Sequence, residues 1–120
     1  MNTRAVVNIA VKNNASWEDA FRFGTVGDTT WSFAGKTFLL EVKASRDDLT
    51  ALLELTTANS RIIVDDNALR VLHFDVTPAD LRAALPVGTY EYDLIMIDGT
   101  VRTNLMGGDL TVCQGVSGIV

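Results

Sequence analysis

Hydrophobic and polar residues alternate along several short segments of the chain. The clearest case is residues 37–43, where Phe38, Leu40 and Val42 share one face of an extended strand and charged residues follow on the other. Similar β-branched or alternating stretches predict further strands at residues 6–11, 17–23, 52–55, 61–64 and 69–76. Short strands at this spacing are typical of an all-β domain.

Residues 85–112 give the strongest signal in the chain. Two runs rich in aromatic and branched side chains, 89–97 and 100–106, flank the dipeptide Asp98-Gly99. Such a dipeptide suits a two-residue turn that requires positive φ, so we expect a long β-hairpin here.

The hairpin is followed by Gly107-Gly108, which predicts a tight turn or a bulge. A further strand is predicted over residues 109–116. We expect the terminal stretch, residues 109–120, to offer a strand edge to a neighbouring chain.

Core positions follow from the same alternation. Tyr90, Tyr92 and Leu94 share one face of the hairpin strand, and Leu69 and Val71 share a face of another strand. These two sets are expected to hold two sheets together.

One helix is predicted, near residues 78–85. Thr77 is placed to cap it, and Pro78 occupies the first helical position, where its missing N–H costs nothing. Leu81 and Leu85 lie four residues apart and can pack the helix onto the sheets.

Length and composition agree with one folded domain spanning residues 1–120. Hydrophobic residues make up 48% of the chain, and a domain of this size buries roughly two thirds of its unfolded surface. We therefore predict an all-β fold, an immunoglobulin-like antiparallel β-sandwich with a single short crossover helix near residues 78–85.

Charge and cysteine content narrow the possible partners and compartments. Ten basic and fifteen acidic residues give a net charge of −5, and no basic run exists to bind phosphates, so nucleic acid is not expected as a partner. The single cysteine, Cys113, cannot form an internal disulfide. No signal or membrane-spanning pattern is visible, so we expect synthesis in a cytoplasm and no membrane contact.

Candidate chemistry is sparse. His73 is the only histidine and has no sequence neighbour at metal-ligand spacing, and Cys113 has no evident base to activate it. Asp65-Asp66-Asn67 and Arg46-Asp47-Asp48 are oxygen-rich but lack a calcium-loop pattern. We expect no catalytic residue, no metal and no cofactor.

The two tryptophans have two possible roles, because aromatic rings are common both in protein cores and at binding interfaces. Trp31 and Phe33 can share one face beside the glycine-bearing loop at residues 24–30, and Trp17 lies upstream. Core packing is the first interpretation. The alternative is that Trp17 and Trp31 contact a protein partner or a sugar.

Several sequence features follow one another in a characteristic order along most of the chain. They are residues 33–38, residues 53–62, and then Gly88, Tyr90, Tyr92, Asp93, Leu94, Asp98, Gly99, Leu105, Gly108 and Val112. In this arrangement the chain resembles small phage and prophage virion proteins with an immunoglobulin-like sandwich, similar to the N-terminal domain of baseplate upper proteins. Ser60 stands where these proteins usually have glycine, and Val116-Ser117 replaces a terminal Val-Thr.

This resemblance implies a virion structural protein, in the tail, the baseplate or a fibre attachment, that is made in the cytoplasm of a host bacterium. Its partners would be other virion proteins and copies of itself in a symmetric assembly. Only structural positions carry over, because the family has no catalytic residues to transfer. Alternatives are a carbohydrate- or receptor-binding module of the virion and a head decoration or head–tail completion protein.

Overall fold

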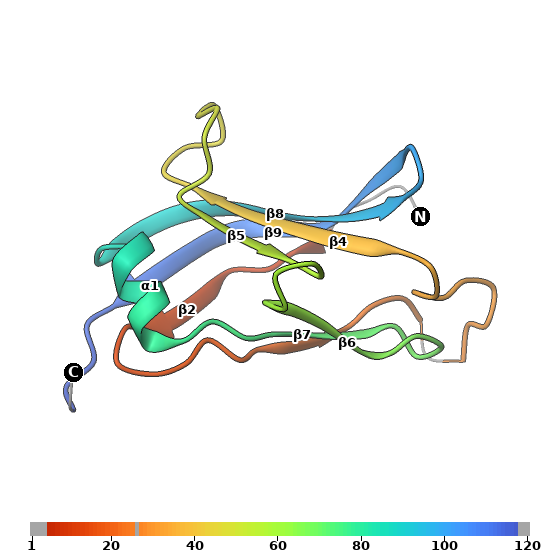
Figure 1. Cartoon of the computed structure of the whole chain (residues 1–120), viewed down its shortest axis with the longest axis horizontal. Coiled ribbons are helices and arrows are strands. Elements are labelled where there is room, and N and C mark those ends of the chain that lie inside the picture. Colours follow the sequence, from red (N-terminus) through yellow and green to blue (C-terminus); the bar gives the residue numbers. More distant parts are fainter. Residues whose placement is uncertain (1–4, 26, 118–120) are drawn as a thin grey trace.

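The computed structural model describes residues 5–25 and 27–117, which form two packed β-sheets and a short helix (Figure 1). The larger sheet has the order β1 (Ala5–Val6), β9 (Val101–Cys113), β8 (Gly88–Asp98), β4 (Thr37–Lys43), β5 (Leu53–Thr56), and β2 (Ile9–Lys12) also pairs with β9. The smaller sheet has the order β3 (Ala20–Arg22), β7 (Val71–Phe74), β6 (Ile62–Asp66). The chain is an all-β sandwich, as predicted.

The strand order is that of an immunoglobulin-like sandwich. If β3 is taken as the second strand of that fold, β3-β7-β6 corresponds to its B-E-D sheet and β9-β8-β4-β5 to its G-F-C-C′ sheet. The N-terminal strands depart from a purely antiparallel arrangement, because β1 and β2 both run parallel to β9. All the other strand pairs are antiparallel.

Two tyrosines of β8, both predicted to have structural roles, anchor the larger sheet. Tyr90 donates its hydroxyl hydrogen to the carbonyl of Pro86, the arrangement known in such sandwiches as a tyrosine corner. Tyr92 donates to the carbonyl of Val7 at 2.6 Å. Both rings and Leu94 are buried, so the core face predicted for this strand is confirmed.

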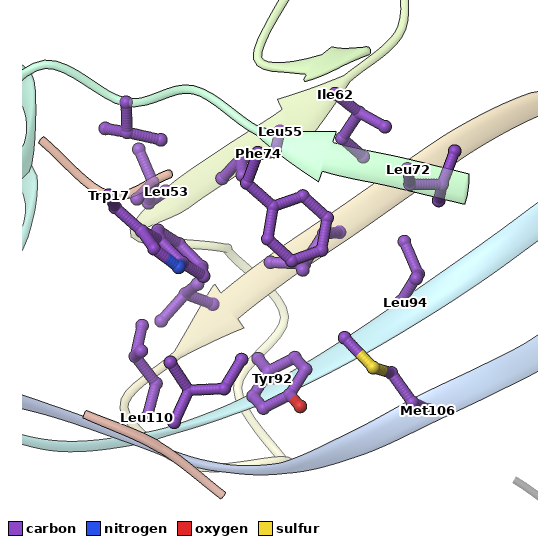
Figure 2. Packing of buried hydrophobic residues seen from close by; sticks show 14 of the residues in the cluster. Trp17, Leu53, Leu55, Ile62, Leu72, Phe74, Tyr92, Leu94, Met106 and Leu110 are labelled. Atoms are coloured by element: carbon purple, nitrogen blue, oxygen red, sulfur yellow. The ribbon is translucent and has the colours of Figure 1, made fainter. Parts of the chain in front are cut away.

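The core lies between the two sheets, where aromatic and branched side chains from both interdigitate (Figure 2). Trp17 and Phe74 meet edge to face, with ring centroids 5.4 Å apart. Leu55, Leu72 and Leu94 are completely buried. Burial of each such side chain contributes on the order of 2 kcal/mol, so this layer is the main source of stability.

The predicted inward face of β7 is wrong. Leu69 is 47% exposed and Val71 is half-buried, whereas Leu72 and Phe74 point into the core. Residues on both faces of this strand are apolar, so alternation alone does not identify its buried side, and a shift by one residue exchanges the faces.

The predicted end of β9 at Gly107-Gly108 is also wrong. The strand continues to Cys113, and Leu105 forms a bulge opposite the step from Leu94 to Ile95. β8 lies on one flank of β9, and the N-terminal strands lie on the other. The terminal strand is therefore internal to the sheet and offers no edge over its paired length.

The turn between β6 and β7 starts later than predicted. Asp65 and Asp66 belong to β6, and the turn follows at residues 67–70. The hairpin turn at Gly99, by contrast, lies where it was predicted, with φ at +62°.

The N-terminal strands join β9 at Gly108. This residue has φ of +154°, and a Cβ atom there would lie 2.6 Å from the carbonyl oxygen of Val7. The Asn8 side chain accepts a hydrogen bond from the backbone N–H of Asp109 at 3.1 Å, and Val7 donates to the carbonyl of Gly107 at 2.9 Å. Only glycine allows two backbones to approach this closely.

The outer edge of β5 is covered by a side chain. The amide of Asn59 accepts from the backbone N–H of Thr56 at 3.0 Å and donates to the carbonyl of Glu54 at 3.1 Å. Arg61 donates to the same carbonyl at 3.1 Å. Asn59 thereby occupies the place of the next strand, which protects this edge from pairing with another chain.

The helix α1 (Pro78–Ala84) connects β7 to β8, as predicted. The Thr77 side chain accepts a hydrogen bond from the backbone N–H of Asp80 at 3.2 Å, and Leu81 and Leu85 are buried. Capping and burial together explain why a helix of so few residues persists.

Replacement of Thr77 by alanine is expected to cost about 1 kcal/mol of unfolding free energy, because backbone N–H groups of the first turn lose their acceptor. Urea unfolding measures the change. Thr100→Ala, at an exposed turn position, is the control. Equal midpoints for the two variants would contradict the cap.

Gly108→Ala is expected to destabilise the protein more than Gly99→Ala does. Both residues have positive φ, but a Cβ at Gly99 meets no atom within 4 Å, whereas one at Gly108 meets backbone. We expect about 1 kcal/mol for Gly99→Ala and roughly 2–3 kcal/mol for Gly108→Ala by thermal unfolding. Equal losses would show that the close approach does not matter.

Candidate functional site

The residues considered for catalysis or metal binding, His73 and Cys113, lie apart from one another in the fold. His73 is on β7 of the smaller sheet, and Cys113 ends β9 of the larger one. The Nδ1 atom of His73 lies 2.8 Å from both carboxylate oxygens of Asp65, on the neighbouring strand β6. The sequence analysis missed this pair, because it depends on how the two strands align across their turn.

Candidate metal ligands do not gather at one place in the described part of the chain. In residues 5–25 and 27–117, no group of three or more histidine, cysteine, aspartate or glutamate side chains could hold a metal ion. The Asp48 carboxylate accepts a hydrogen bond from the backbone N–H of Ser45 at 3.3 Å, as in an ordinary turn. No helix within the described part is long and apolar enough to cross a membrane.

The two tryptophans occupy different environments. Trp17 is 1% exposed, and its indole N–H donates to the Asp19 carboxylate at 3.0 Å. Its ring is therefore closed to a partner. Trp31 is half-buried, packs edge to face against Phe33 and lies 5.0 Å from the Arg70 guanidinium. The guanidinium thus covers one face of the Trp31 ring in a cation–π contact.

Arg70 organises the loop beside Trp31, and the sequence analysis did not single it out. It has φ of +59° and is 1% exposed. Its guanidinium donates hydrogen bonds to the backbone carbonyls of Phe23, Thr25, Asp28, Trp31 and Ala68. A buried charge requires such compensation, so the guanidinium and the loop hold one another in place.

Asp28 lies at the outer rim of this loop. Thr30 donates to its carboxylate from the side-chain hydroxyl at 2.6 Å and from the backbone N–H at 2.8 Å. These hydrogen bonds, with a smaller contribution from the Arg70 charge, lower the pKa of Asp28 below its ordinary value of 3.8.

A hollow of about 520 Å³ lies on the outer face of the larger sheet. It is polar and mainly acidic, and it crosses β4, β8 and β9. Its lining is Val6, Asn8, Glu41, Lys43, Arg46, Glu91, Tyr92, Asp93, Asn104, Gly108 and Asp109. We call it the acidic groove.

Carboxylates face one another across the strands at the acidic groove. Glu54, Glu41 and Asp93 are in direct register on β5, β4 and β8. Glu91 and Asp109 form the next acidic pair, on β8 and β9. Like charges placed directly opposite one another destabilise a sheet, but Lys43 is in register with Glu91 and Arg46 forms an ion pair with it, so the acidic charge of this face is partly compensated.

The groove also fixes a loop. Arg46 donates from Nε and Nη2 to one oxygen of the Glu91 carboxylate at 3.2 Å, and its backbone N–H donates to the other oxygen at 2.7 Å. The turn predicted at residues 46–48 is thus tied to the sheet. The alternation in β4 correctly placed Glu41 and Lys43 outward, but no local signal shows which strands lie beside them.

A scan of the chain against models of known protein families found no match, and a search of curated proteins found none either.

Arg70→Met is expected to cost roughly 2–4 kcal/mol of unfolding free energy, because several buried carbonyls lose their donor. Arg22→Met, on an exposed strand position, should cost little and is the control. Urea unfolding of both variants measures the difference. Arg70 would not hold the loop if the two variants were equally stable.

Thr30→Val is expected to raise the pKa of Asp28 toward its ordinary value, because the hydroxyl donor is lost while the backbone N–H remains. Since the folded-state pKa is lowered, the ionised carboxylate stabilises this loop above the unfolded-state value, and the contribution disappears as the pH falls through the folded-state pKa. NMR titration of the carboxyl carbon measures the shift. An unchanged titration would contradict the assigned cause.

Proposed function

We propose that this chain is a structural protein of a bacteriophage-type virion, acting in the tail, the baseplate or a fibre attachment. In this role it contributes binding surfaces and no catalysis. Its partners are other virion proteins and further copies of itself. It is made in the cytoplasm of the host bacterium and ends in the particle.

The acidic groove is the observation that supports this proposal most directly. Acidic side chains gathered on an open sheet face provide a surface for a partner of opposite charge. The lining of the groove is mainly polar, whereas a typical small-molecule pocket is lined mainly by apolar side chains. A protein surface with basic side chains is the partner that fits it.

The residues on which the phage resemblance depends also have structural roles. Tyr90 forms the tyrosine corner, Gly99 makes the hairpin turn and Gly108 admits the N-terminal strands. These positions define a rigid sandwich with two loop-bearing ends, which suits a protein that joins larger pieces of an assembly.

A carbohydrate- or receptor-binding module receives less support. That function requires an accessible aromatic ring, but Trp17 is buried and Trp31 lies against Arg70. Head decoration and head–tail completion remain within the same structural class, and the position of the protein in the particle distinguishes them from a tail role.

The direct test is to locate the protein in particles. Virions purified from a producing host by density gradient should contain the chain at a fixed number of copies, measured by quantitative mass spectrometry. Electron cryomicroscopy of the same particles would then place it in the tail, baseplate or head. Its absence from purified particles, despite expression in the producing cells, would overturn the proposal.

Charge reversal in the acidic groove is expected to impair incorporation. Glu41→Lys combined with Asp109→Lys should lower the number of copies per particle by about tenfold, the loss expected when ~1.4 kcal/mol of contact energy disappears. Asp47→Lys, on the exposed turn, changes charge outside the groove and is the control. Equal incorporation of both folded variants would exclude the groove as the contact.

A further inference from the structure

The smaller sheet has an open edge at β3. In the described part of the chain, β3 pairs only with β7. Trp17 and Val76 exchange two backbone hydrogen bonds, and Phe74 donates to the carbonyl of Asp19 at 2.9 Å. The backbone N–H and C=O groups of the odd-numbered residues therefore point toward β7. Those of the even-numbered residues point away from the sheet.

Three exposed residues occupy this open edge: Glu18, Ala20 and Arg22. Their side chains share the outer face of the sheet, since residues two apart in a strand point the same way. The order is acidic, small and basic. The edge has no proline and no bulge, and its outer side chains are of both charges; its protection is limited to its short length and to Asp19, an exposed acid on the other face of the strand.

The rest of the fold explains why the edge is open. In the immunoglobulin arrangement a first strand can pair with the strand equivalent to β3, but here both N-terminal strands pair with β9. The edge at β5 is covered by Asn59, and the other edge of the smaller sheet, β6, is interrupted by a bulge after Val64 and carries Asp65 and Asp66.

We propose that β3 pairs with β3 of a second copy of this chain, antiparallel and about a two-fold axis at Ala20. In this register Ala20 faces Ala20, and Glu18 of each copy faces Arg22 of the other. The outward-pointing backbone groups of all three residues then find partners. The surface is self-complementary, as a two-fold interface requires, and the small alanine lets the strands meet at the axis.

Pairing of this kind joins two smaller sheets into one continuous sheet with the order β6-β7-β3-β3-β7-β6. The contact is short, so the free protein forms a weak dimer, with Kd on the order of 0.1 mM. The inference rests on the geometry of β3 and does not depend on the proposed virion role.

The test uses the full-length chain and sedimentation equilibrium up to roughly 1 mM, where a dimer of this affinity is populated. Glu18→Arg alone places arginine opposite arginine, and Arg22→Glu alone places glutamate opposite glutamate. Each variant is expected to associate at least about tenfold more weakly than the parent protein. An equimolar mixture of the two is expected to recover association, because both charge pairs reform in the mixed dimer.

Glu54→Arg, on the covered edge at β5, is the matched control and should leave association unchanged. Circular dichroism confirms that the exposed substitutions leave the fold intact. A parent protein that stays monomeric at the highest concentration would overturn the proposal. So would a dimer that neither reversal weakens, or two weakened variants whose mixture does not associate.

Discussion

The parallel pairing of the N-terminal strands with β9 is the constraint on which the architecture depends. It makes the terminal strand internal, and it requires a glycine at residue 108, where Val7 would meet any side chain. The Tyr92 hydroxyl binds the same carbonyl of Val7, so the first and last strands and β8 meet at one point. Because the N-terminal segment is committed to the larger sheet, it is not available to cover the smaller one.

The two sheets consequently present different outer surfaces. The larger sheet is wide, with opposed carboxylates and a hollow, whereas the smaller sheet is narrow and ends at an uncovered strand. A protein with a charged face and an unprotected edge at β3 has two independent ways to contact neighbours. This division is consistent with a part built into a larger assembly, where each copy contacts more than one partner.

Local signals in the sequence predicted the local structure correctly. The cap at Thr77, the turn at Gly99 and the buried face of β8 depend on residues close together in the chain, and all three lie as expected. Apart from the late start of the turn between β6 and β7, the errors concern long-range relations. The inward face of β7 and the continuation of β9 through Gly108 depend on strands far away in the sequence, as does the pairing of Asp65 with His73.

Arg70 holds its loop through main-chain oxygens, and this has an evolutionary consequence. Every amino acid supplies a carbonyl, so Thr25 and Asp28 can change identity without losing their backbone hydrogen bonds to the guanidinium. Gly24 and Gly27 are constrained, because both have positive φ and a side chain at Gly24 would also collide with the guanidinium. The molecule can therefore diversify the outward side chains of this loop to suit new neighbours without redesigning the sandwich beneath it.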